Sequence, residues 1–118
     1  MSLPEITAEA IASAADEHGF RLERNTGTAI DLAEKTCCAL GGAALLIDPR
    51  LAAAGGPITA RILVEESIGL DAYRGLEYGF EGWPKNGTDC SEDRDVFLRY
   101  YAIGEAAAEL VASDAKGA

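Results

Sequence analysis

The sequence predicts an all-α protein, a single domain built as a bundle of about five helices with close helix packing at glycine and alanine. Apolar residues recur at spacings of three and four along most of the chain. Capping residues, glycines and prolines separate these periodic segments. The 118 residues, 48% of them hydrophobic and 25% charged, suit one globular domain with one core. We expect residues 1–112 to form the domain and residues 113–118 to fray.

The first two helices follow from this spacing. Ile11, Ala14, Ala15 and His18 lie at i, i+3, i+4 and i+7, and Gly19 can end that helix. Thr28 can cap a second helix of roughly five turns, which Pro49 stops. Its apolar stripe steps by three and four through Ile30, Ala33, Cys37, Leu40, Ala44 and Ile47.

The third helix begins near Pro57 and ends at Gly69. Asp71 then caps a fourth helix, residues 72–83, with two faces. One face is large and apolar, with Tyr73, Leu76, Phe80 and Trp83; the other is a groove of Gly75, Gly79 and Gly82. Because glycine inside a helix lowers stability, we expect this groove to pack closely against Gly41 and Gly42. Alternatively, the segment "GFEGW" is rich in turns and lines a pocket.

A loop over residues 84–95 leads to the last helix, which starts at Ser91 or Asp93. Its apolar side chains form two stripes, and a chain this short has limited core to cover both. We therefore expect a homodimer in which one stripe packs against a second copy. The candidate interaction face is Tyr73, Trp83, Val96, Tyr100, Tyr101 and Ile103. The expected core is Ile11, Ile30, Cys37, Leu40, Ile47, Leu63, Val64, Leu76, Phe80, Phe97, Tyr100 and Leu110.

Charge is the strongest compositional feature. Twenty acidic against ten basic residues give a net charge of −10, which disfavours direct binding to nucleic acid or to anionic membranes. A dimer contact must then be apolar with acids at its rim, and salt should tighten it or leave it unweakened. A second hypothesis is an acidic inhibitor or nucleic-acid mimic that binds a basic protein. Its patch is Glu77, Glu81, Asp89, Glu92, Asp93 and Asp95.

The adjacent cysteines Cys37 and Cys38 raise a third hypothesis, a small-molecule or redox-sensing site. On a helix, neighbouring side chains point in different directions, so this pair does not readily share a metal or form a disulfide. We therefore expect both thiols to pack as small apolar groups. A zinc site that adds Cys90 and His18 lacks any Cys-x-x-Cys motif, and no cofactor signature is present.

Three cysteines do not make a disulfide framework, which favours a reducing cytoplasm. We find no signal peptide, and the longest uncharged run, Thr36 to Ile47, is too short to span a membrane. The only histidine has no nucleophile motif near it in the sequence. The favoured function is a small acidic helical protein-interaction module that is non-enzymatic and self-associating.

Overall fold

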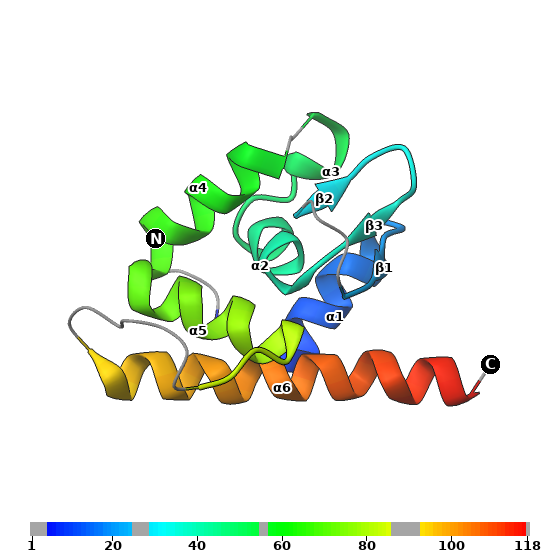
Figure 1. Cartoon of the computed structure of the whole chain (residues 1–118). Coiled ribbons are helices and arrows are strands. Elements are labelled where there is room, and N and C mark those ends of the chain that lie inside the picture. Colours follow the sequence, from blue (N-terminus) through cyan, green and yellow to red (C-terminus); the bar gives the residue numbers. More distant parts are fainter. Residues whose placement is uncertain (1–4, 25–28, 55–56, 86–92, 118) are drawn as a thin grey trace.

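The computed structural model describes residues 5–24, 29–54, 57–85 and 93–117, which form six helices and three short strands (Figure 1). Five helices of nine or more residues confirm the predicted all-α bundle, and the structure adds a four-residue helix and a small sheet. In chain order the elements are α1 (Ala8–Glu17), β1 (Arg21–Leu22), β2 (Ile30–Asp31), β3 (Thr36–Cys37), α2 (Ala39–Ile47), α3 (Leu51–Ala54), α4 (Pro57–Ile68), α5 (Leu70–Glu81) and α6 (Arg94–Gly117).

Helix α1 forms as its local signals predict. The Thr7 side chain caps it by accepting the N–H of Ala10 at 3.0 Å. At the other end Gly19 takes a φ of 78°, and the next N–H, of Phe20, bonds back to the carbonyl of Ala15. This bond satisfies the carbonyl of Ala15, which the end of the helix leaves free. A left-handed glycine therefore ends α1 as predicted.

The predicted five-turn second helix is wrong over its first half, where the chain forms a hairpin instead. Ile30 and Cys37 are paired residues of the antiparallel strands β2 and β3. The Asp31 carboxylate accepts the N–H of Glu34 at 2.9 Å and holds the turn between the two strands. Lys35 has a φ of 59°, which no α-helix contains. The sheet is completed by β1, which pairs in parallel with β3 in the order β1-β3-β2.

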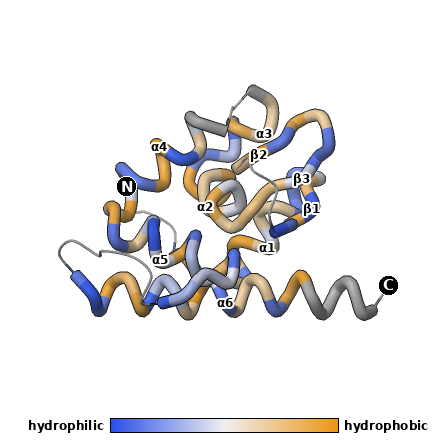
Figure 2. The backbone as a smooth tube through the Cα atoms, in the orientation of Figure 1, coloured by the Kyte–Doolittle hydropathy of each residue, from blue (hydrophilic) through white to orange (hydrophobic). Residues whose placement is uncertain are grey.

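Helix α2 therefore begins only at Ala39, and it forms the centre of the molecule. It carries no charged residue, its first seven residues are buried, and it packs against α1, α4 and α5 (Figures 1 and 2). Gly41 and Gly42 lie where neighbouring backbone comes close: a Cβ at Gly41 would lie 2.8 Å from the Ala29 carbonyl carbon, and Gly42 faces Ile11. The chain then leaves the helix at Asp48, ahead of Pro49.

Helices α5 and α6 pack side by side and run in the same direction. A Cβ at Gly75 would lie 3.1 Å from the Phe97 carbonyl carbon, and one at Gly79 would lie 2.8 Å from that of Tyr101. On α6, Gly104 faces the α5 backbone, since a Cβ there would lie 3.0 Å from the carbonyl carbon of Gly79. Moving along α5 from Gly75 to Gly79 moves the contact along α6 from Phe97 to Tyr101, so the two helices are parallel. Glycines on both helices allow their backbones to come into contact.

The sequence correctly indicates close approach at glycine but assigns the wrong partners. Gly75 and Gly79 pack against α6, whereas Gly41 and Gly42 pack against Ala29 and α1. The third groove glycine, Gly82, ends α5 with a φ of 77° and so lies outside the helical groove.

The whole chain has a radius of gyration of 13.1 Å, close to the roughly 13.5 Å expected for a compact chain of this length. Within the described ranges, no helix is both long enough and apolar enough to cross a membrane.

Candidate functional site

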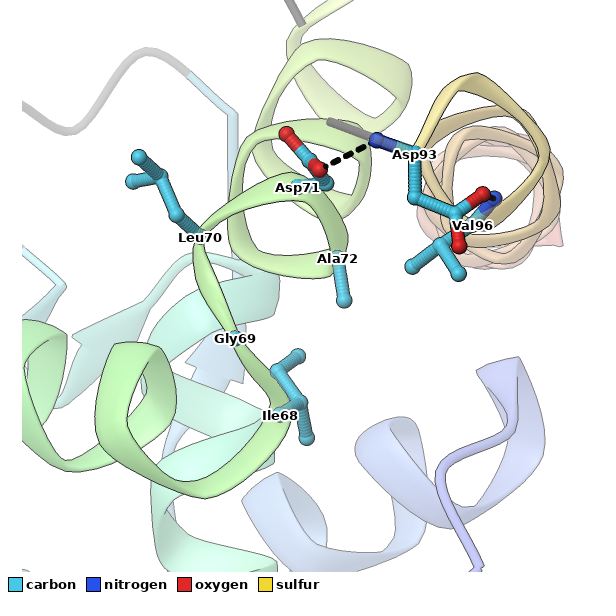
Figure 3. Close-up of a pocket in the computed structure, with 7 residues that line it drawn as sticks. All are labelled: Ile68, Gly69, Leu70, Asp71, Ala72, Asp93 and Val96. Carbon is cyan, nitrogen blue, oxygen red and sulfur yellow. Dashed lines mark hydrogen bonds between the residues drawn. The ribbon is translucent and has the colours of Figure 1, made fainter. Parts of the chain in front are cut away.

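Three helix ends surround an open pocket of about 380 Å³, which we call the Val96 pocket (Figure 3). In Figure 3 the side chains of Ile68, Ala72 and Val96 point into the same open space, whereas Leu70 points away from it. The apolar wall thus combines the end of α4, the first turn of α5 and the first turn of α6. The full lining is Ile68, Gly69, Leu70, Asp71, Ala72, Asp93 and Val96.

Two aspartates form the polar part of this lining. Asp71 accepts the N–H of Asp93 at 2.8 Å, and Asp93 caps α6 by accepting the N–H of Val96 at 3.1 Å. Negative charge is favourable at helix N-termini, so these carboxylates stabilise the starts of two parallel helices. The pocket therefore combines one apolar wall with a polar part of similar extent, in which the carboxylates are held by backbone donors.

The structure does not gather the six predicted interaction residues on one surface. Tyr73 bonds to Arg61 of α4 at 3.0 Å, and Val96 lines the pocket. Tyr100 and Ile103 are half-buried and pack against the core. Tyr101 is 6% exposed and packs between α6 and α5, so it is not part of an open surface.

Trp83 was expected on the apolar stripe of a helix, but it lies just beyond the end of α5. Its side chain is 41% exposed, and its ring meets that of Tyr78 edge-on at 4.9 Å. The hydroxyl of Tyr101 donates to the Trp83 carbonyl, so α6 holds the chain where it leaves α5. Trp83 is therefore the one member of the predicted face that is exposed.

The predicted acidic patch is only partly testable, because Asp89 and Glu92 lie outside the described residues. Among the others, Glu77 is paired with Arg61 at 2.8 Å, and Asp93 caps α6. Glu81 is half-buried near the end of α5 and Asp95 is exposed on α6, so the continuous patch remains a prediction.

Both described thiols are buried in the core. Burial, and after it the neighbouring Cys38, raise the pKa of Cys37 to about 12. Burial also raises the pKa of Cys38, although backbone N–H groups of Gly41 and Leu40 and the charge of Arg61 act in the opposite sense. The Lys35 ammonium, three residues before Cys38 in the sequence, lies over the Phe20 ring, 5.2 Å from its centroid. This geometry favours packing over redox chemistry.

Arg61 forms the main polar link between α4 and α5 in the described part of the chain. Its guanidinium donates to the Tyr73 hydroxyl and to the Glu77 carboxylate, and all three side chains are half-buried. Nowhere among the described residues do three His, Cys, Asp or Glu side chains come together as a metal site.

Comparison with known proteins finds no matching family model, no matching curated protein and no matching solved structure.

Sequence reasoning missed the pocket because it arises from tertiary packing. Val96 was recognised as an interaction residue, but Ile68 and Ala72 were not. Only the parallel pairing of α5 with α6 brings the two helix starts together beside the end of α4. The available signal was Gly69, which predicts a sharp end to α4 and hence a neighbouring start of α5.

Proposed function

We propose that this protein is a small, acidic, non-enzymatic helical module that self-associates through the Val96 pocket. The observation that supports this function is an open apolar wall with carboxylates beside it. That composition matches the contact expected for a chain of charge −10, in which apolar surface must do the binding.

The reason for self-association differs from the one that the sequence suggested. Both stripes of α6 are used within the chain: Phe97, Tyr101 and Gly104 pack against α5, while Tyr100 and Ile103 pack against the core. The apolar surface that supports a dimer is therefore the pocket at the start of α6. A two-fold contact would bring two such pockets together and cover both.

Substitution of Val96 by aspartate tests this proposal. An acidic residue suits the first turn of a helix, so Val96→Asp should leave α6 intact while it puts charge into the pocket. Leu98→Asp is a matched control, because Leu98 lies on the same helix, outside the pocket lining, and is 38% exposed. Light scattering should show a dimer for the parent and for Leu98→Asp, and a monomer for Val96→Asp. Equal masses for the two variants would contradict the pocket as the contact.

A further inference from the structure

A second exposed surface, at the end of α5, differs in character from the Val96 pocket. We define the Trp83 surface as Trp83, Tyr78, Arg24 and Lys85. Trp83 is 41% exposed and Tyr78 is half-buried beside it. Trp, Tyr and Arg are the residue types most enriched at the energetic centres of protein interfaces.

Two cations lie close to the chain on either side of Trp83, one beside Gly82 and the other on Lys85. Gly82 directly precedes Trp83 in the chain. The Arg24 guanidinium lies so close to Gly82 that it would contact a Cβ at that position. The Lys85 ammonium lies over the Tyr101 ring, 5.3 Å from its centroid. Neither cation forms an ion pair with any carboxylate of the described residues. In a chain with twice as many acids as bases, these two bases give the surface positive charge, and Glu105 on α6 is the exposed acid that acts on Tyr101 beside them.

The surface is also held in place before any partner arrives. Tyr101 fixes the Trp83 carbonyl, and the Arg94 side chain donates to the Lys85 carbonyl at 2.7 Å. The Trp83 ring rests against Tyr78 and the Lys85 ammonium against Tyr101. Side chains that are already ordered lose less conformational entropy on binding, which favours affinity.

From this geometry we infer that the Trp83 surface binds an acidic segment of a partner protein. An apolar side chain of that segment covers the Trp83 ring, and its carboxylates pair with Lys85 and Arg24. The charge complementarity selects an acidic rather than a basic segment, because Lys85 and Arg24 would repel a basic one. This surface and the Val96 pocket use different residues, so the inference is independent of self-association.

Trp83 is the only tryptophan of the chain, so its fluorescence reports on this surface directly. The probe is a synthetic peptide of glutamates interrupted by leucines, and a lysine-and-leucine peptide of the same pattern is the counter-probe. The acidic peptide should change the emission saturably at low salt, and added salt should weaken that binding. A response to the basic peptide alone, or to both peptides equally, would overturn the assignment.

Charge variants sharpen the test. Lys85→Glu and Arg24→Glu should each weaken binding of the acidic peptide about three- to tenfold, as expected when an exposed ion pair is replaced by repulsion. Glu105→Lys should strengthen binding, because Glu105 is the exposed acid whose charge acts on Tyr101 beneath this surface. Arg99→Glu is the matched control: it makes the same change in net charge at another cation that lies over a ring.

The variants give distinct outcomes. Weaker binding in Lys85→Glu and Arg24→Glu with an unchanged Arg99→Glu supports the inference. Equal loss in all three would show only an effect of net charge and would overturn it. An emission change that appears on concentrating the protein without peptide, together with a higher mass, would assign the surface to a second copy and overturn the acidic partner.

Discussion

Replacing Gly79 by alanine tests the packing that organises the fold, the backbone contact between α5 and α6. The new Cβ would lie 2.8 Å from the carbonyl carbon of Tyr101 and 3.0 Å from its Cα. Both are backbone atoms, which cannot turn aside as a flexible side chain would. The two helices must therefore separate, and the aromatic residues between them must shift.

Two opposing effects set the size of the change. Alanine favours the helix by about 1 kcal/mol over glycine. Overpacking costs about 1–3 kcal/mol, and a rigid backbone contact puts this site at the upper end. We expect the free energy of unfolding of Gly79→Ala to fall by about 1–2 kcal/mol, which lowers Tm by roughly 4–10 °C at this chain length.

Urea unfolding followed by far-ultraviolet circular dichroism measures this change. Ala102→Leu is the control, because it adds bulk on the exposed side of α6 and should alter stability by no more than about 0.5 kcal/mol. A Gly79→Ala protein that is as stable as the parent, or more stable, would refute the close contact.

A double-mutant cycle with Gly104 adds a sharper check. Gly104 faces Gly79 across the same contact, since its Cβ would lie 2.6 Å from the Phe80 nitrogen and 3.0 Å from the Gly79 carbonyl carbon. Once one alanine has moved α6 away, the second should cost less. The loss in the double variant should therefore be smaller than the sum of the single losses by about 0.5 kcal/mol or more. Strict additivity would show that the two glycines do not share a contact.

Three further predictions concern the core and the link between α4 and α5. Cys37→Ala should lower stability by about 1 kcal/mol through a small cavity, as measured by urea unfolding; no loss would contradict its buried position. Because folding raises the pKa of Cys37 from 9.0 to about 12, the fold keeps this proton longer than the unfolded chain does, and stability should fall as pH rises from about 9 towards 12. That loss, followed by urea unfolding against pH, should become smaller in Cys37→Ala, with the remainder due to the buried Cys38, and a pH dependence unchanged by this substitution would contradict it. Glu77→Gln should cost about 1–2 kcal/mol because it leaves the half-buried Arg61 without its carboxylate, whereas the exposed Glu65→Gln should cost nearly nothing; equal effects would show that the ion pair adds no stability.

The parts of the fold that depend on neighbouring residues could be predicted from the sequence. Gly19 ends α1 and Gly69 ends α4 as predicted, through capping that needs only a few adjacent residues, whereas the Thr7 cap at the start of α1 was not predicted. The expected core is also largely correct: eight of its residues are buried, and Ile47, Leu63, Tyr100 and Leu110 are half-buried against the others. A residue can belong to the core whether the backbone around it is helix or strand.

The hairpin could not be distinguished from a helix by spacing. Ile30 and Cys37 are seven residues apart, which is two helical turns but also the distance between paired residues across a short hairpin. The left-handed φ of Lys35 and the turn hydrogen bond of Asp31 distinguish a hairpin from a helix here. Neither feature can be seen in the spacing of apolar residues. Cys37 and Cys38 are buried although the segment is a strand followed by a helix start, and not one continuous helix. The prediction that the two thiols pack in the core therefore did not depend on the helix that was wrongly predicted.

The candidate sites depend on contacts that are distant in the sequence. Tyr101 was placed on an interaction face because its stripe on α6 is apolar, but glycines on α5 let the two helices close over it. The same parallel pairing creates the Val96 pocket by joining the starts of two helices. Such pairing depends on contacts between two helices that are separate in the sequence, which local periodicity does not specify.

Sedimentation equilibrium over a range of protein concentrations, at low and at high salt, tests the proposed function most directly. If apolar surface in the Val96 pocket holds two acidic copies together, the mass should rise from monomer to dimer with concentration. Higher salt should leave the dimer as strong or make it stronger, because it screens the repulsion between two chains of charge −10. A monomer at every concentration would contradict self-association, and a dimer that salt dissociates would show that opposite charges, rather than apolar surface, hold the contact.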